Sequence, residues 1–426
     1  MTAKAGTIEQ LGAEVRERLR LANGDNVTDE AVSGIARDVV EEYQHRSHRD
    51  GTPLLARPAA IVDRIVEDIT GWGPLTNLVR DADIEEILVE GSNIFVMDNT
   101  SSRPTQVNVH ATEGELLQAI IRMLRGSNRK LDYENPQAKA SVLNGEARLT
   151  VTIPPASSRL SATIRRYIRR FQSLRSLVDV GTMSVEAAGF LWALMQDRTS
   201  RFVVSGIPGA GKTTLLAAMH SAAPPHHTIR ILEQVTELDL GRALTSNYQE
   251  VDGGHRVGKE LNLRHLIRHA LSMRPDRIVV GEVLGEESAE LFRAANTGAG
   301  FAVSNHAYSA RAALDALVTT AIHAGENISI EAATRAFADA IDHVIHLAMD
   351  HRGGESRRRV MEILGVAPGE GGFSTTTIFA RGSFDEPLLW TGARPMDDKA
   401  ALIDFSLPEG MSLLGILDGS IRPTLP

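Results

Sequence analysis

The chain contains no cysteine among its 426 residues, so disulfides, thiolate metal sites and cysteine nucleophiles are all excluded. It also has no apolar run near the roughly 18 residues that a membrane-spanning helix needs. The late apolar run Met411–Leu417 is far too short. The first residues, MTAKAGTIEQ, lack the apolar segment of a secretory signal. We therefore expect a cytoplasmic chain that meets a membrane only through partners.

The charge balance is acidic, with a formal net charge of −9. This balance argues against a protein built mainly to coat nucleic acid. Two basic stretches, Arg165–Arg170 and Arg357–Arg359, leave a local contact with nucleic acid open. Hydrophobic residues make up 42% and charged residues 23% of the chain, which is ordinary for a globular protein. At roughly 100 to 200 residues per domain, two or three domains are expected.

Residues 1–68 are predicted to form a helical extension. Thr7 and Gln10 form a capping-box pattern, and apolar residues then recur at helical spacing. A second helix is expected to open at Thr28. The polar, proline-punctuated stretch Arg46–Pro58 is predicted to be a linker.

Residues 69–168 combine short strand patterns with one apolar helix face. The segments Glu86–Glu90 and Ile94–Asp98 flank a turn and are predicted to be strands. Thr112 and Glu115 form a second capping-box pattern just before the apolar face. These features predict a small α+β domain.

Residues 169–366 alternate between helical and strand patterns, which is typical of a parallel α/β sheet. The candidate strands are Arg201–Val204, Ile229–Leu232, Arg277–Val280, Phe301–Val303 and His343–Leu347. Residues 367–426 are rich in Gly, Pro and Ser, and we predict a loosely packed C-terminal extension there.

The sequence GIPGAGKT at 206–213 matches the phosphate-loop pattern G-x-x-x-x-G-K-[ST]. A predicted strand runs into it and a helical pattern follows, so the dipole of that helix points at the same anion. The lysine ammonium serves the β and γ phosphates, and the threonine hydroxyl serves Mg²⁺. We predict a site for ATP with Mg²⁺. The predicted nucleotide-binding residues are Gly206, Ile207, Pro208, Gly209, Ala210, Gly211, Lys212, Thr213 and Thr214.

Two glutamates follow predicted strands of the same sheet. Glu233 ends the first of these strands, and Glu282 follows the second after Gly281. Ligands of open α/β sheets lie beyond the carboxyl ends of the strands, so both carboxylates are expected near the phosphate loop. Hydrolysis needs acidic groups there to hold Mg²⁺ and to orient water. His306 also follows a strand, and it is either a nucleotide contact or a structural histidine.

With these motifs taken together, residues of about 60 to 366 resemble the secretion ATPases of type II, type IV and tight-adherence pilus systems, most closely the CpaF/TadA subfamily. The segments that carry this resemblance are GWGPLTNLVRDADIEEILVEG at 71–91, NGEARLTVTIPP at 144–155, SATIRRY at 161–167, SLVDVGTMSVEAAGFL at 176–191, SGIPGAGKTT at 205–214, ILEQVTEL at 231–238, LRHLIRHALSMRPDRIVVGEV at 263–283 and NTGAGFAVSNHAYS at 296–309.

The resemblance implies a RecA-like core and assigns roles to its residues. Lys212 and Thr213 bind phosphate and Mg²⁺, Glu233 polarises the attacking water, and Glu282 supports the metal. His306 is implied to sense the γ phosphate.

The resemblance also implies partners. Arg148 and Arg165 match arginines that reach the phosphates from the N-terminal domain. The family is hexameric and holds nucleotide between its two domains. It works at the inner face of the cytoplasmic membrane on a platform protein, and its motion drives pilus assembly or export.

Three positions depart from the family pattern. Gln234 stands where aspartate is usual, Leu284 where arginine is usual, and Ala299 where a further histidine is usual. We expect these changes to alter γ-phosphate sensing or turnover. They leave open a nucleotide-gated scaffold with little hydrolysis, and the basic stretches leave open a DNA-transfer motor. The cargo and the roles of residues 1–60 and 367–426 are not specified by the sequence.

Overall fold

The computed structural model describes residues 5–23, 29–50, 54–98, 103–109, 111–125, 127, 129–167, 173–251, 261–283, 285–324, 328–350, 356–370 and 372–426. Contacts divide the chain into two compact units, the first ending at Arg166 and the second running from Tyr167 to Pro426. Each unit is described by itself.

The first unit begins with three helices, α1 (Ala5–Asn23), α2 (Asp29–Asp50) and α3 (Pro58–Thr70), which bury a shared apolar cluster. Two predictions here were wrong. Helix α1 begins at Ala5, so Thr7 lies inside the helix and does not cap it. Helix α2 runs to Asp50, so the polar stretch from Arg46 to Asp50 is helical, and Arg46 and Arg49 are exposed on it. Thr28 lies outside the described residues.

The rest of the first unit is an antiparallel sheet in the order β3-β2-β1-β6-β5-β4. Its elements are η1 (Gly73–Leu75), α4 (Thr76–Arg80), β1 (Ile84–Glu90), β2 (Asn93–Asp98), β3 (Thr105–Val107), α5 (Glu113–Met123), β4 (Gln137–Val142), η2 (Leu143–Gly145), β5 (Ala147–Thr152) and β6 (Ser161–Arg166). Helix α5 packs its apolar face on the sheet. The capping box is confirmed, because the Thr112 hydroxyl accepts from the Glu115 N–H and Glu115 accepts from the Thr112 N–H.

The second unit contains a sheet in the order β15-β14-β13-β12-β7-β11-β10-β8-β9. Its strands are β7 (Arg201–Ser205), β8 (Ile229–Glu233), β9 (Thr245–Gln249), β10 (Arg277–Val280), β11 (Gly300–Asn305), β12 (His343–Asp350), β13 (Arg357–Gly369), β14 (Gly372–Ala380) and β15 (Leu389–Trp390). The run from β12 to β9 is parallel, whereas β13, β14 and β15 pair antiparallel. All five strands predicted in this region are confirmed. Strands buried on both faces read as continuous apolar runs, which is why they were recognisable.

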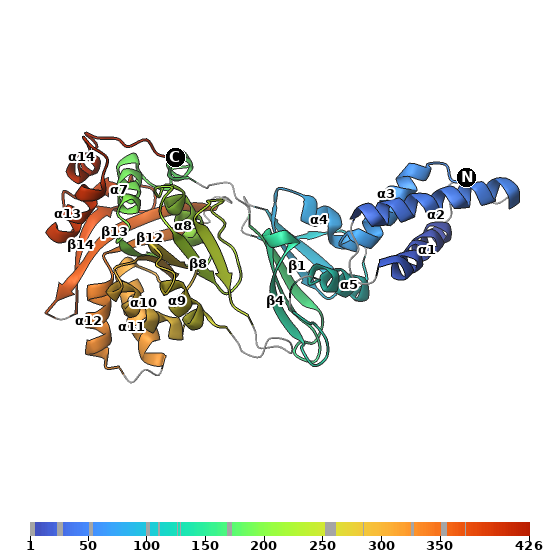
Figure 1. The fold of residues 1–426 in the computed structure, drawn as a ribbon, viewed down its shortest axis with the longest axis horizontal. Coiled ribbons are helices and arrows are strands. Elements are labelled where there is room, and N and C mark those ends of the chain that lie inside the picture. Colours follow the sequence, from blue (N-terminus) through green and yellow to red (C-terminus); the bar gives the residue numbers. More distant parts are fainter. Residues whose placement is uncertain are drawn as a thin grey trace. The chain divides into compact units, whose positions relative to one another are not determined.

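Helices cover both faces of this sheet and make a three-layer α/β fold (Figure 1). One face carries α6 (Leu174–Asp179), α7 (Val185–Gln196), α8 (Lys212–Ser221), α13 (Asp397–Ser406) and α14 (Leu413–Leu417). The other carries α9 (Leu263–Leu271), α10 (Glu290–Asn296), which follows η3 (Glu286–Ala289), α11 (Ala310–His323) and α12 (Ile330–Ala340).

The prediction of a loosely packed extension over residues 367–426 was wrong. This segment completes β13, adds β14 and β15 to the sheet, and closes one face with α13 and α14. Phe379, Leu388 and Ile416 are buried in the same core as the parallel strands. Its glycines and prolines punctuate short elements that have little recognisable period of their own.

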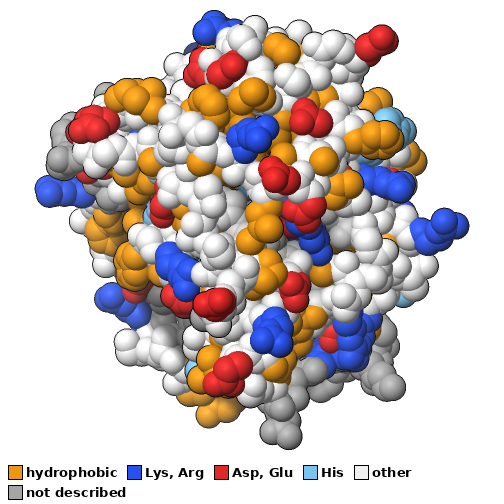
Figure 2. All heavy atoms as spheres, turned by 90° about the vertical axis from the view of Figure 1, so that its left-hand side faces the viewer, with side chains coloured by type: hydrophobic (Ala, Val, Ile, Leu, Met, Phe, Trp, Pro, Cys, Tyr) orange, Lys and Arg blue, Asp and Glu red, His pale blue; other side chains and the backbone are white. Residues whose placement is uncertain are grey.

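The surface of the second unit that bears α12, α13 and α14 mixes apolar and charged side chains in small groups (Figure 2). In the part of the chain that the structure describes, no helix has the length and apolar character needed to span a bilayer.

Candidate nucleotide-binding site

The loop between β7 and α8 occupies the carboxyl end of a central strand. Gly206, Gly209 and Gly211 have φ angles of 154°, 79° and 94°, a region that side chains other than glycine rarely adopt. A methyl group on Gly206 would lie 2.5 Å from the carbonyl oxygen of Leu347 in β12. The loop therefore packs directly on the neighbouring strand, and it ends at the N-terminus of α8, where the helix dipole favours an anion.

The Lys212 ammonium curls back over this loop. The side chain is buried, and Nζ donates to the carbonyl oxygens of Gly206 at 2.9 Å and Ile207 at 3.3 Å. A third contact joins Nζ to Nδ1 of His306 at 2.9 Å. An anion bound by the loop would compete for these N–H groups, so Lys212 is placed to grip a phosphate.

His306 joins Lys212 to Glu282. Its Nε2 lies 2.5 Å from the Glu282 carboxylate. Nδ1 also lies 3.3 Å from the Gly206 carbonyl oxygen. In the tautomer whose Nδ1 accepts from Lys212, the imidazole proton lies on Nε2 and is donated to Glu282. The three side chains come from α8, the end of β11 and the end of β10, and they form one connected chain. His306 thus lies beside the phosphate loop, and its contact with a γ phosphate stays a prediction.

Glu233 is buried at the end of β8, and its carboxylate accepts from the N–H groups of Glu237 at 3.0 Å and Leu238 at 3.2 Å. Burial raises the pKa of this carboxyl to about 8, although the two backbone donors favour the charged form. A methyl group on Gly281 would lie 2.9 Å from Cγ of Glu233. Glycine is therefore required before Glu282, since the Glu233 side chain lies against the backbone there.

A magnesium ion suits the donors at this edge of the sheet. Thr213 offers a hydroxyl at the start of α8, and Glu282 offers a carboxylate, both hard oxygen ligands. No group of three or more His, Cys, Asp or Glu able to hold a metal occurs among the described residues. Mg²⁺ commonly takes one or two protein ligands and fills its other positions with phosphate and water.

Two further residues touch the loop from β12 and β13, and the sequence did not identify either. Arg358 Nε donates to the Gly209 carbonyl oxygen at 2.8 Å. Met349 of β12 is the register partner of Arg358 in β13. A methyl group on Gly209 would lie 3.2 Å from Cε of Met349. No local motif marks this position, because β13 joins the site only through strand pairing.

Residues 68–350 match the family model described as type II/IV secretion system protein. The chain belongs to this family. Over 351 residues it is 31% identical to a putative conjugal transfer protein of Mycobacterium tuberculosis. The aligned region covers 79% of this chain and 93% of that relative. It is also 28% identical over 307 residues to the type IV secretion system protein PtlH of Bordetella pertussis, covering 66% of this chain and 90% of PtlH.

A solved structure of the pilus retraction motor PilT with bound ADP is similar over 67% of this chain and 82% of PilT. The sequence identity is 18% and the TM-score 0.48, and we draw no residue roles from it.

One of the departures from the family pattern lies away from the phosphate loop of this secretion-system protein. Ala299 directly precedes β11, whereas His306 directly follows it. At about 3.3 Å per strand residue, the two are roughly 20 Å apart. Ala299 therefore lies away from His306 within one chain, and its effect on γ-phosphate sensing or turnover stays a prediction. Gln234 directly follows Glu233 at the carboxyl edge, and Leu284 lies outside the described residues.

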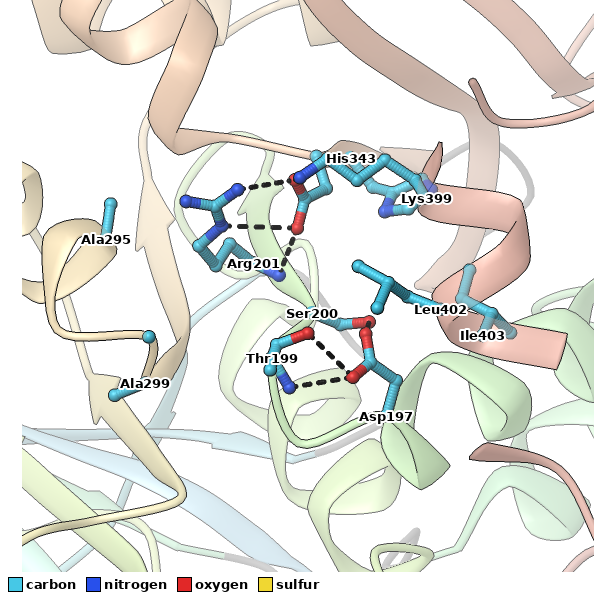
Figure 3. A pocket seen from close by; sticks show the side chains of 12 residues that line it. Asp197, Thr199, Ser200, Arg201, Ala295, Ala299, His343, Lys399, Leu402 and Ile403 are labelled. Atoms are coloured by element: carbon cyan, nitrogen blue, oxygen red, sulfur yellow. Dashed lines mark hydrogen bonds and ion pairs between the residues drawn. The ribbon is translucent and has the colours of Figure 1, made fainter. Parts of the chain in front are cut away.

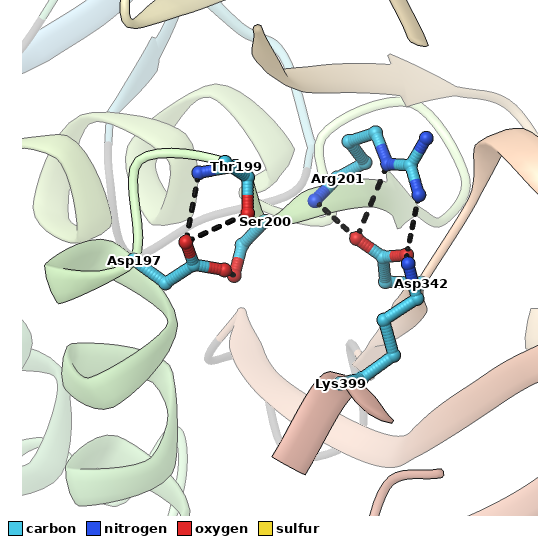
Figure 4. Close-up of polar contacts among 6 residues, drawn as sticks. All are labelled: Asp197, Thr199, Ser200, Arg201, Asp342 and Lys399. Carbon is cyan, nitrogen blue, oxygen red and sulfur yellow. Dashed lines mark hydrogen bonds and ion pairs between the residues drawn. The ribbon is translucent and has the colours of Figure 1, made fainter. Parts of the chain in front are cut away.

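Ala299 instead lines a cavity of about 260 Å³ at the amino ends of β7 and β12. Figure 3 shows Ala295 and Ala299 on one side of it, with Leu402 and Ile403 of α13 on the other. Figure 4 shows the buried Asp342 carboxylate held between Arg201 and Lys399, with side-chain contacts of 3.1 and 3.0 Å. This edge of the sheet thus anchors α13 and is separate from the nucleotide loop.

Arg148 and Arg165 lie in the first unit of this secretion-system protein, on β5 and β6. They are direct cross-strand neighbours in the antiparallel register. The pairing brings two predicted phosphate contacts to one place on that sheet. Their contact with nucleotide stays a prediction. Arg169 and Arg170 lie outside the described residues.

Proposed function

We propose that this protein hydrolyses ATP at the loop of residues 206–213 and uses the cycle to drive a secretion, pilus or conjugative machine. The connected chain Lys212–His306–Glu282, with Glu233 packed beside Gly281, is the observation that carries the proposal. It combines a phosphate-binding cation with two carboxylates at one edge of the sheet. A loop that only bound nucleotide would have no need of the second, buried carboxylate.

The residues suggest a division of labour. Lys212 transfers its N–H groups from the loop carbonyls and His306 to the phosphates when ATP binds. Glu233 in its ionised form accepts the proton of the water that attacks the γ phosphorus. Because the pKa of this carboxyl is raised to about 8, the fraction of the protein that carries the ionised base rises with pH through that value. The γ-phosphoryl group passes to that water oxygen and ADP leaves with the bridging oxygen.

Magnesium would be held by Thr213 and Glu282, and it would neutralise charge on the β and γ phosphates. His306 has a separate task in this scheme. When a phosphate takes Lys212 from it, the imidazole keeps its contacts with Glu282 and with the Gly206 carbonyl oxygen. His306 therefore reports to the Glu282 strand end that the loop is filled, which is the γ-phosphate sensing implied by the family resemblance.

The assembly is proposed as a homohexamer on an inner-membrane platform protein, with Arg148 and Arg165 contributing to the phosphate site. Support comes from the resemblance to the CpaF/TadA subfamily and from the family match. The names of the relatives, a putative conjugal transfer protein and a type IV secretion protein, favour a conjugative or type IV role beside the pilus role. Strong stimulation of turnover by DNA would favour the conjugative role.

Steady-state phosphate release tests the proposal. The Lys212→Ala variant should lose hydrolysis by at least about 100-fold, because a preorganised charge at the transferring phosphate is removed. Arg175→Ala is the matched control, since Arg175 is exposed and, among the described residues, its side chain pairs only with Asp179 on α6. If the wild-type protein binds magnesium–ATP but releases no phosphate above the Lys212→Ala background, the protein is a nucleotide-gated scaffold and the motor proposal fails.

A further inference from the structure

The phosphate loop follows β7, and the strands on the two sides of β7 contribute different residues to the surroundings of the loop. Strand β7 lies between β11 and β12. Glu233, Glu282 and His306 all follow strands on the β11 side. The β12 side contributes Met349 and Arg358, and neither has a part in the proposed hydrolysis. A nucleotide whose γ phosphate meets Lys212 and His306 has to place its nucleoside away from them, and Met349 and Arg358 touch the loop from the opposite, β12 side.

Arg358 differs from the arginines on either side of it. Arg357 makes ion pairs with Asp350 and Asp385, and Arg359 donates to the carbonyl oxygen of Val180. Among the described residues, Arg358 makes its only side-chain hydrogen bond through Nε, to Gly209. No carboxylate of the described residues pairs with it. The middle arginine of this strand is therefore a half-buried cation held against a phosphate loop.

The contacts fix where the guanidinium lies. Arg358 Cδ is 3.4 Å from the position that a methyl group on Gly211 would take, and Nε is bonded to Gly209. The side chain thus runs along the loop from its end toward its crest. Met349 Cε and Sδ lie against the same crest, 3.2 and 3.6 Å from a methyl group on Gly209. A planar cation and a polarisable thioether flank one point of the loop.

We propose that Arg358 and Met349 form the nucleoside-binding side of the site, with the guanidinium plane stacked on the base of the bound nucleotide. A guanidinium stacks well on aromatic rings and still offers N–H donors at its edge. A methionine thioether packs favourably against a ring. This inference rests on the proposed nucleotide site, and it extends that site by assigning the group that recognises the nucleoside rather than the phosphates.

Equilibrium binding of ATP, ADP and inorganic tripolyphosphate, each with Mg²⁺, tests the assignment on the full chain. Arg358→Ala should weaken ATP and ADP by about tenfold, the size expected for one lost stacking contact. It should leave tripolyphosphate within about twofold, since tripolyphosphate has no base. Arg357→Ala, a neighbouring arginine that is paired with carboxylates away from the loop, should change none of the three.

Two further variants make the reading specific. Arg358→Lys keeps the positive charge but lacks the planar guanidinium, so it should lower the affinity for ATP as much as Arg358→Ala does. Met349→Ala should also lower the affinity for ATP, but by a smaller factor. Equal weakening of tripolyphosphate and ATP by Arg358→Ala, full rescue by lysine, or no effect on ATP would each overturn the proposal. Failure of the motor proposal is recognised separately, because it shows as wild-type binding without phosphate release.

Discussion

Replacing Glu233 by glutamine should make the protein more stable while it stops hydrolysis. Burial raises the pKa of the Glu233 carboxyl from its ordinary value of 4.5 to about 8. At neutral pH the folded protein therefore keeps a proton that the unfolded chain has released. Stability must fall as pH rises between these two values, because the unfolded state is the one that ionises freely. Glutamine has no proton to lose, so it escapes this penalty.

The size of the effect follows from the pKa shift. Each unit corresponds to about 1.4 kcal/mol, so the difference in unfolding free energy between Glu233→Gln and wild type should grow by about 1.4 kcal/mol per pH unit. It should begin near pH 4.5 and level off near pH 8. At pH 7 the sum is about 3 kcal/mol. The glutamine carbonyl can still accept from the N–H groups of Glu237 and Leu238, so the backbone donors keep a partner.

Urea unfolding of the second unit at pH 6.0, 6.5, 7.0 and 7.5 measures this directly. The slope of the difference with pH is the decisive quantity, because any change in packing shifts all four points equally. Glu409→Gln, at an exposed carboxyl of the same unit, should stay within about 0.5 kcal/mol of wild type at each pH. A flat difference for Glu233→Gln would show that the carboxylate is already charged in the folded protein at these pH values, and the raised pKa of the buried carboxyl would have to be abandoned.

Two other perturbations separate chemistry from architecture. His306→Ala removes the link between Lys212 and Glu282, so turnover should fall by about 10- to 100-fold, while ATP affinity changes little; a parallel loss of affinity in a binding titration would contradict the sensing role. Asp342→Ala leaves Arg201 and Lys399 without their shared carboxylate and should cost about 3 kcal/mol in urea unfolding. Burial alone would raise the pKa of Asp342, but Arg201 and Lys399 hold it below its usual value. Its contribution is therefore present above pH 3.8 and is lost as pH falls below that; an Asp342→Ala variant as stable as wild type at pH 7 would refute the anchoring role.

The carboxyl edge was predictable from sequence because its candidate residues lie at the ends of strands that are buried on both faces. Such strands are short continuous apolar runs: Glu233 is the last residue of β8, Glu282 follows β10 after Gly281, and His306 directly follows β11. The phosphate loop adds a local sequence pattern, in which glycines at fixed positions precede a lysine and a threonine, and this pattern can be recognised without the structure. Topology then brings the strand ends together, since parallel neighbours place their carboxyl ends at one edge.

The parts that escaped prediction depend on pairing between distant segments. Arg358 belongs to β13, which reaches the loop only through its register with β12. The C-terminal strands were missed because β14 presents a run of exposed threonines and β15 is two residues long. Gly281 was visible as part of a motif, but the reason for the glycine, the Glu233 side chain lying against it, is a contact between two strands.

The sheet divides its work between its two edges. At the carboxyl edge, Glu233 is held in a position that costs stability, and Lys212 is held by loop carbonyls that a phosphate must displace. At the amino edge, Asp342 gathers Arg201 and Lys399 and ties α13 to β7 and β12. Strain that serves chemistry has to be offset elsewhere in the fold. The same strand β7 begins at Arg201 in the ionic cluster and ends at the phosphate loop, so one strand joins the two edges.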